Sequence, residues 1–180
     1  RDGLYGLEFT APKNRIINTT VYEYLTSRDQ GGPILQNPSG DMSGQAGGMD
    51  WYYIHTYYQS WQHWGMSICN PHTLSPLYNA EPTLTMPNQR LRSHHIGFDG
   101  QPTNTLHYRF MGSWSKHWGS LEDPLPTPLT QLSLMGELTY SPLKWRGWQF
   151  TGALALDRSL LIGNNFGGMI TIRKIGKIKD

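Results

Sequence analysis

Residues 104–117 have the sequence NTLHYRFMGSWSKH, in which apolar and polar side chains alternate along the chain. Leu106 and Tyr108 belong to the apolar set, and His107 and Arg109 fill the positions between and beside them. Successive residues of a β-strand point to opposite faces of a sheet. This period of two therefore predicts a long strand with one apolar face and one polar face.

Six further segments show the same alternation between turn residues, which predicts an all-β, antiparallel fold of about seven strands. These segments are 3–10, 16–26, 91–98, 129–141, 148–157 and 164–173. Residues 28–90 are rich in Gly, Pro, Asn and aromatic residues and show no sustained alternation. We expect them to form one long loop.

The composition is unusual for a soluble domain. Hydrophobic residues make up 37% and charged residues 16% of the chain, against roughly 45–50% and about 25% in typical domains. Gly, Pro and aromatic residues, including 7 Trp and 10 Tyr, take their place. The net charge of +2 without long basic runs gives no footprint for nucleic acid as a partner. The single cysteine, Cys69, excludes an intramolecular disulfide framework.

Alternation by itself fits both a soluble β-sandwich and a membrane barrel. Several predicted strands reach about 10 residues, the length that a tilted strand needs to cross a bilayer. Aromatic residues collect near the strand ends, as in the interfacial girdles of outer-membrane barrels. They are Tyr108, Trp114, Trp118, Tyr140, Trp145 and Trp148. We therefore expect a transmembrane β-barrel whose apolar face contacts outer-membrane lipid.

The polar faces of the predicted strands carry full charges, which suits a wet barrel lumen. The predicted lumen charges are Glu8, Arg92, Arg109, Glu137, Asp157 and Arg173. We interpret them first as a network of mutual ion pairs, and only second as a ladder for a substrate.

The predicted connections alternate in length along the chain, as periplasmic turns and extracellular loops do in outer-membrane barrels. Residues 12–14, 99–103 and 142–147 form the short set, and residues 28–90, 118–128 and 158–163 form the long set. Seven antiparallel strands cannot close a barrel in the usual way. We expect residues 1–180 to be part of a larger, porin-sized barrel, with further strands from a preceding segment or from another chain.

One part of the long loop is dense in aromatic residues and suggests contact with glycans. Aromatic faces pack against sugar C–H groups, and phenol, indole and imidazole groups supply hydrogen bonds. The candidate glycan-binding residues are Asp50, Trp51, Tyr52, Tyr53, Tyr57, Tyr58, Trp61, His63 and Trp64. A short helix or a plug folded into the lumen would need the same aromatics for packing, and a plug could also line a binding path.

Metal binding and catalysis have no strong signal in the sequence. His94 and His95 are neighbours in a predicted strand, so they point to opposite faces and cannot bind one metal ion together. His55 and His63 lack the carboxylate pattern of a zinc site. No serine stands in a nucleophile-elbow pattern, and no phosphate-binding glycine motif occurs. We expect no metal, no cofactor and no enzymatic activity.

Four short motifs, in this order along the chain, resemble Bacteroidetes members of the capsule assembly Wzi family. They are YGLE at 5–8, VYEYL at 21–25 continuing into RDQGGP at 28–33, DWYY at 50–53, and DR at 157–158 followed by GNNFG at 163–167. The resemblance covers nearly all of the chain and corresponds to the carboxy-terminal part of the family's longer proteins. It implies a porin-sized barrel in the bacterial outer membrane that acts as a lectin for exported capsular polysaccharide.

Two functions from different classes follow from these observations. In the first, the barrel binds and anchors, or helps to assemble, polysaccharide at the cell surface. In the second, it is a channel or a structural subunit of an outer-membrane complex, and the loop is a plug. An outer-membrane hydrolase is a weaker third possibility because no nucleophile motif is present.

Overall fold

The computed structural model describes residues 2–11, 13–31, 34–35, 46–47, 51–54, 57, 60–68, 70–79, 81–121 and 123–176. The described chain is all-β, as predicted, and its main element is an antiparallel sheet of seven strands. The strands are β1 (Gly3–Thr10), β2 (Thr19–Thr26), β7 (Leu91–Thr103), β8 (Leu106–Gly119), β9 (Pro124–Tyr140), β10 (Trp148–Ser159) and β11 (Asn165–Lys174). Within the described residues, no helix is long and apolar enough to span a membrane.

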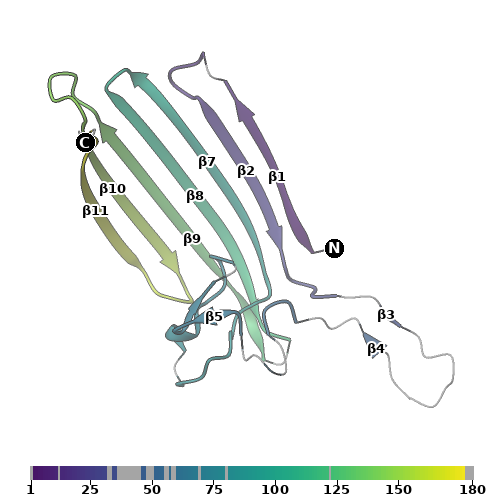
Figure 1. The fold of residues 1–180 in the computed structure, drawn as a ribbon. Helices are drawn as coiled ribbons and strands as arrows, with labels where there is room; N and C mark the ends of the chain where they lie inside the picture. Colours follow the sequence, from purple (N-terminus) through teal and green to yellow (C-terminus); the bar gives the residue numbers. More distant parts are fainter. Residues whose placement is uncertain are drawn as a thin grey trace. The chain divides into compact units, whose positions relative to one another are not determined.

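The seven strands lie in the order β1-β2-β7-β8-β9-β10-β11 (Figure 1). Apart from the short strands β3 to β6, strands that follow one another along the chain therefore pair with one another. The sheet is not closed: β1 and β11 are its two edges. The described residues of the segment between β2 and β7 form two small hairpins and one 3₁₀ turn. These are β3 (Ile34–Leu35) with β4 (Ala46–Gly47), β5 (Gln62–His63) with β6 (Met66–Ser67), and η1 (Pro76–Tyr78).

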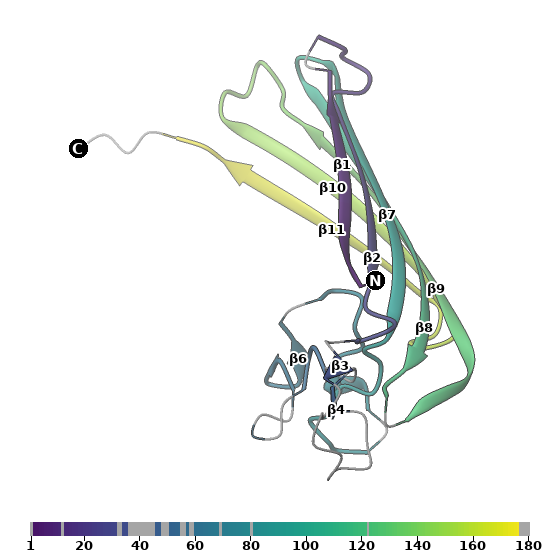
Figure 2. The same ribbon diagram turned by 90° about the vertical axis from the view of Figure 1, so that its right-hand side faces the viewer.

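The chain divides into two compact units. Unit 1 comprises Arg1–Tyr5, Tyr24–Ser93 and Ser115–Thr130, and unit 2 comprises Gly6–Glu23, His94–Trp114 and Gln131–Asp180. Unit 1 thus holds the long connection and the strand ends that adjoin it in sequence. Within unit 2 the strand direction rotates from β7 to β11 (Figure 2), as expected from the right-handed twist of β-strands.

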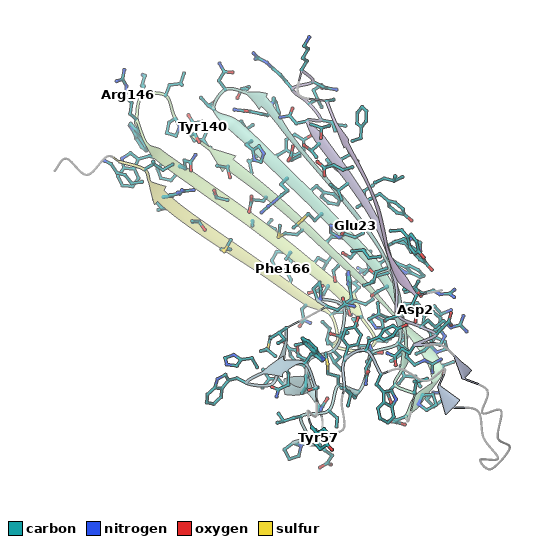
Figure 3. The ribbon with its side chains drawn as sticks, turned by 45° about the vertical axis from the view of Figure 1, so that its right-hand side comes forward. Asp2, Glu23, Tyr57, Tyr140, Arg146 and Phe166 are labelled. Atoms are coloured by element: carbon teal, nitrogen blue, oxygen red, sulfur yellow. The ribbon has the colours of Figure 1, made fainter. Side chains whose placement is uncertain are left out.

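The register of β9, β10 and β11 keeps apolar and polar side chains on separate faces. Phe166 of β11 (labelled in Figure 3) pairs with Leu156, which pairs in turn with Leu134 of β9. On the other face, Thr151 pairs with both Thr139 and Thr171. The alternation predicted from the sequence is therefore also the alternation of the folded strands.

Strand β7 runs to Thr103, whereas the sequence predicted that it ends at Phe98 and that residues 99–103 form a turn. The Asn18 N–H donates to the Asp99 carbonyl at 2.8 Å, and the Gln101 N–H donates to the Arg15 carbonyl at 2.9 Å. A side chain at Gly100 would collide with the Ile16 carbonyl. The missing Cβ of Gly100 lets the preceding connection approach and pair with β7, and this pairing extends the strand.

Strand β9 begins at Pro124, whereas the sequence predicted a proline-broken loop up to Pro128. Pairing with β10 starts at Gln131, which faces Ser159. The preceding part of β9 therefore has no β10 strand beside it. Proline is tolerated where a strand has a free edge, because its missing N–H has no partner to lose there. The alternate prolines of this segment lie in the part of β9 that has no strand on its β10 side.

These longer strands overturn the predicted alternation of short and long connections. The predicted long connections 118–128 and 158–163 shrink to 120–123 and 160–164 between the strands. Both are shorter than the connection 11–18, which was predicted as a short turn at 12–14. Only the segment between β2 and β7 is long. Any orientation of the sheet in a membrane must therefore rest on that segment alone.

Apolar side chains do not gather in a core among the described residues. The buried hydrophobic residues are Met86, Leu91 and Ala153. The buried polar residues are more numerous and comprise Thr26, Ser27, Gln30, Asn70, Thr73, Ser75, Asn88, Gln89, Ser93, Ser115, His117, Ser120 and Ser159. Soluble proteins bury apolar residues in preference to polar ones, so the described chain departs from the soluble pattern.

The same inversion appears along individual strands of unit 2. On β9, Leu138 and Tyr140 are exposed. Glu137, which precedes Leu138, and Thr139, which lies between the two, are half-buried. On β10, Leu154 and Leu156 are exposed while Ala153 is buried. Since these strands separate apolar from polar side chains by face, it is the apolar face that stays uncovered.

Candidate functional site

Hairpin β5–β6 presents an aromatic side chain at its tip. Gln62 pairs with Ser67, and His63 pairs with Met66. The two turn residues between the strands, Trp64 and Gly65, have positive φ angles of 52° and 78°. This is the pattern of a type I′ turn, which matches the twist of the two strands it joins. The Gly65 N–H donates to the Gln62 side-chain carbonyl at 2.7 Å and fixes the turn.

Trp64 is an unfavourable residue for this turn position. A left-handed backbone costs an ordinary L-residue roughly 1–2 kcal/mol, and type I′ turns favour Asn, Asp or Gly instead. The Trp64 side chain is also 87% exposed, so packing does not offset this cost. Backbone strain of this kind collects at functional sites, and Trp64 is therefore the leading candidate for a binding residue among the described residues.

A groove of about 710 Å³ lies beside this hairpin, within the size range of small-molecule sites. We call it the hairpin groove. It is lined by Gln62, His63, Trp64, Gly65, Pro76, Leu77, Asn79, Glu81, Pro82, Thr83 and Leu84. The Leu77 N–H donates to the Gly65 carbonyl at 2.9 Å, so η1 is bonded directly to the hairpin turn.

Asn79 is a polar residue in the wall of the hairpin groove. Its side-chain amide nitrogen donates to the Thr83 carbonyl at 3.0 Å and to the Thr85 carbonyl at 2.9 Å. These bonds orient the side chain. The Asn79 Oδ1 atom is buried and has no hydrogen-bond partner in the described part of the chain. A buried acceptor without a partner is costly.

The residues of the hairpin groove suit a ligand with apolar and hydroxyl-bearing faces. The Trp64 indole offers a flat apolar surface, and the His63 ring stands edge-on to it at a centroid distance of 6.3 Å. Asn79 and Glu81 line the same groove, and a carboxylate such as that of Glu81 offers oxygen acceptors. Sugars combine C–H faces with hydroxyl donors, and this arrangement can receive both.

The structure brings His63 and Trp64 of the predicted glycan-binding residues together in the hairpin groove. Leu77, Asn79 and Glu81 were not predicted, because no local pattern links them to the hairpin. A glycine directly after Trp64 is a usual signal of a type I′ turn, and it could have indicated the hairpin from the sequence.

Tyr52 and Tyr53 use their hydroxyl groups within the protein. The Tyr52 hydroxyl donates to the Asp2 carboxylate at 3.1 Å, and the Asn70 side-chain amide donates to the Tyr53 hydroxyl at 3.2 Å. The exposed residues Trp51, Tyr57 (labelled in Figure 3) and Trp61 do not line the hairpin groove. The predicted Asp50 and Tyr58, and also His55, lie outside the described residues.

Asp2 anchors the start of the long connection in unit 1 (Figure 3). Its carboxylate accepts the backbone N–H groups of Asp29 at 3.1 Å and Gln30 at 2.5 Å, and the Thr26 hydroxyl at 3.3 Å. The Tyr52 hydroxyl donates to the same carboxylate, so the start of the connection and the more distant Tyr52 are bonded to one side chain. Sequence reasoning missed Asp2, because its partners are far away along the chain.

The predicted lumen charges form one ion pair rather than a network. Arg109 and Glu137 lie 3.2 Å apart, and theirs is the single salt bridge among the described residues. On β10 and β11, Asp157 pairs with Asn165 and Arg173 pairs with Gln149. These two pairs stand eight residues apart along the ladder, roughly 27 Å at a rise of about 3.4 Å per residue.

The remaining two predicted lumen charges, Glu8 and Arg92, lie apart from that ion pair. The Glu8 carboxylate accepts the Thr10 hydroxyl at 3.4 Å. The Arg92 guanidinium lies over the Trp118 ring, 5.8 Å from its centroid. Alternation along β7 puts Arg92 on the same side as His94, which is the apolar side of the strand, and opposite His95, which is on the polar side. Arg92 therefore does not belong to the polar face.

His94 and His95 point to opposite sides of β7, as predicted. His94 Nδ1 lies 2.8 Å from the Tyr22 hydroxyl, and His95 Nδ1 lies 2.7 Å from the Ser113 hydroxyl. No group of three or more His, Cys, Asp or Glu residues with metal-site geometry occurs among the described residues.

Ser115, His117 and Asn88 form a buried chain of hydrogen bonds that superficially resembles a hydrolytic triad. His117 Nε2 lies 2.7 Å from the Ser115 hydroxyl, and His117 Nδ1 lies 2.6 Å from the Asn88 amide nitrogen. The Asn88 Oδ1 atom accepts the Gly119 N–H at 3.2 Å, so its amide nitrogen must be the group that donates to Nδ1.

This orientation decides the role of His117. Because Nδ1 accepts a hydrogen bond, the imidazole proton is on Nε2 and is donated to Ser115. A general base would need an unprotonated nitrogen facing the serine. Ser115 and His117 are also 2% and 0% exposed. The arrangement satisfies buried polar groups and fixes the end of β8, and it is not set up to activate Ser115.

Comparison of the chain with protein-family models, with curated proteins and with solved structures finds no match.

Proposed function

We propose that the protein is part of an outer-membrane β-barrel that binds capsular or other surface polysaccharide through the hairpin groove. In this proposal the apolar face of the sheet contacts lipid, and the connection between β2 and β7 lies at the extracellular mouth. The polysaccharide is anchored at the cell surface or held there during assembly. The resemblance of the sequence motifs to the capsule assembly Wzi family supports the same function.

The distribution of side chains supports the membrane part of the proposal. The sheet has an uncovered apolar face and, opposite it, a half-buried polar face, which is the reverse of the soluble arrangement. This distribution suits a barrel with lipid around it and water in its lumen. Strands β7 to β11 contain between 10 and 17 residues. About 9–11 residues suffice for a tilted strand to cross a bilayer.

One observation carries the binding part of the proposal: Trp64 occupies a strained, highly exposed turn position in the wall of the hairpin groove. Neither the fold nor the stability of the hairpin requires a tryptophan there. A surface lectin does require an exposed aromatic face, because it contacts the C–H face of a sugar ring.

The experiment compares Trp64→Ala with Trp61→Ala in the intact protein, folded in detergent micelles. Purified capsular polysaccharide from the bacterium that makes the protein is titrated by surface plasmon resonance. We expect Trp64→Ala to weaken binding about tenfold, since a stacking aromatic contributes on the order of 1.5 kcal/mol. Trp61 is an exposed tryptophan of the same connection that does not line the groove, and its replacement should leave binding within about twofold.

Heat-dependent electrophoretic mobility serves as the folding control for both variants. Equal losses of binding in Trp61→Ala and Trp64→Ala would contradict the hairpin groove as the site. Normal binding by Trp64→Ala, with the barrel folded, would remove the groove from the function altogether.

A second candidate function is that of a structural subunit or channel in an outer-membrane complex. The two unpaired edges of the sheet, β1 and β11, favour it, since exposed strand edges pair with other strands. Copurification of a fixed partner that is crosslinked through β1 or β11, together with unaltered polysaccharide binding by Trp64→Ala, would support this candidate over the first.

A further inference from the structure

Three cationic side chains surround one tryptophan in unit 1. The Arg28 guanidinium lies 4.8 Å from the centroid of the Trp118 ring, the Arg92 guanidinium lies 5.8 Å from it, and the Lys116 ammonium lies 5.6 Å from it. We call Arg28, Arg92, Lys116 and Trp118 the Trp118 cluster. Each cation–π contact is favourable, but three like charges around one ring repel one another.

No acidic side chain neutralises the Trp118 cluster among the described residues, where the single salt bridge is Arg109–Glu137. The Nε atoms of both Arg28 and Arg92 are buried and have no hydrogen-bond acceptor in the part of the chain that the structure describes. Buried, unpaired donors on charged groups are costly. Two such donors beside a third cation indicate a site completed by an anion that carries several acceptor oxygens.

The backbone around the Trp118 cluster is held in place without help from a ligand. The Ser27 N–H donates to the Leu91 carbonyl at 2.9 Å, and the Trp118 N–H donates to the Arg90 carbonyl at 2.8 Å. The Arg90 side chain donates to the Arg28 carbonyl at 2.8 Å. These bonds join the end of β2, the start of β7 and the end of β8, so the cations are preorganised.

The Trp118 cluster belongs to the apolar side of its strands. Alternation along β8 puts Lys116 and Trp118 on the side of Trp114, and alternation along β7 puts Arg92 on the side of Ile96. The cluster also lies at the strand ends that lead into the long connection, where β2 ends and β7 begins. Tryptophan and basic residues at the end of an apolar strand face are typical of the level of lipid headgroups.

We propose that the Trp118 cluster binds the phosphate groups of an anionic lipid headgroup in the leaflet beside the long connection. A phosphate offers several acceptor oxygens to the guanidinium and ammonium donors, and the two arginines can each bind it in a bidentate manner. This inference rests on the proposed membrane location. It is independent of polysaccharide binding in the hairpin groove.

The test measures lipid binding to the intact protein in detergent micelles by native mass spectrometry. The probes are lipid A with two phosphate groups and the same lipid after enzymatic removal of both phosphates. We expect the wild-type protein to bind the phosphorylated lipid at least tenfold more tightly. Lys116→Gln should weaken that binding about tenfold, and Arg28→Gln with Arg92→Gln should remove most of the preference for phosphate.

Two variants guard against a trivial loss of folding. Arg28→Lys keeps the charge and should retain most of the binding. Lys174→Gln removes a cation that lies 4.8 Å from the Trp148 ring, where a single cation meets a single indole. This matched change should leave the phosphate preference unchanged, and an equal loss in Lys174→Gln would overturn the assignment to the Trp118 cluster.

Further probes separate the sources of the anion. Inorganic phosphate at millimolar concentration should compete only weakly, and polygalacturonate, an acidic glycan without phosphate, should not compete. Strong competition by polygalacturonate would overturn the lipid assignment in favour of an acidic polysaccharide. Equal binding of phosphorylated and dephosphorylated lipid would overturn the inference while leaving the membrane proposal intact. Failure of the wild-type protein to insert into vesicles would contradict both.

Discussion

At the scale of single residues, the backbone preference of Trp64 conflicts with its proposed role in binding. Its φ of 52° lies in the left-handed region, where a bulky side chain is unfavourable. Gly65 follows at φ 78°, so the turn needs left-handed residues at both positions. The sequence pattern pointed to the aromatic residue, but only the backbone geometry distinguishes it from Trp61 nearby.

We predict that Trp64→Asn separates stability from binding. The change creates an Asn-Gly turn, the preferred type I′ sequence, and should raise the free energy of unfolding by about 1 kcal/mol. It also removes the indole and should weaken polysaccharide binding about tenfold. Urea unfolding in micelles and the binding titration measure the two effects. A variant that is less stable than the wild type would contradict the strain at this position.

At the scale of elements, the ends of the strands depend on their neighbours. Strand β7 continues through Gly100 because the connection 11–18 pairs with it, and β9 continues through its prolines because β10 is absent beside them. Local residue preferences favoured a turn and a loop at these places. Pairing partners far away in sequence overrode both preferences.

We predict that Gly100→Ala destabilises the protein by about 2 kcal/mol, because a Cβ there overlaps the Ile16 carbonyl and comes within 2.8 Å of the Tyr108 ring. Gly136→Ala on β9 is the matched control, since nothing lies within 4 Å of its added methyl group. Urea unfolding in micelles compares the two. Equal effects would show that the loss of glycine flexibility, and not the close approach of Ile16, matters at Gly100.

At the scale of the whole molecule, the decisive property is which face of the sheet is apolar. Among the described residues, exposed hydrophobic side chains far outnumber the buried ones, which are Met86, Leu91 and Ala153. The sheet also has two unpaired edges. The proposed larger barrel would explain both features, because lipid would cover the apolar face and further strands would pair with β1 and β11.

The proposed lipid contact predicts that arginine substitutions at two neighbouring residues of β11 have opposite effects on membrane insertion. Ile170 is 85% exposed on the apolar face, and Thr171 follows it on the polar face. Ile170→Arg should block or strongly reduce insertion into vesicles, because an arginine facing the middle of a bilayer costs about 2–4 kcal/mol. Thr171→Arg should insert normally. In a soluble sheet both exposed substitutions would be harmless, and that result would refute the membrane proposal.

The sequence by itself determined the all-β class, the seven strands and the separation of apolar from polar faces, because side-chain alternation is a local property of an extended backbone. Tertiary structure alone decided where β7 ends, where β9 begins, and which residues meet at a site. Trp64 meets Asn79 in the hairpin groove, and Trp118 meets cations from neighbouring strands. Such contacts depend on pairing between segments that are distant in sequence, and no local sequence pattern indicates that pairing.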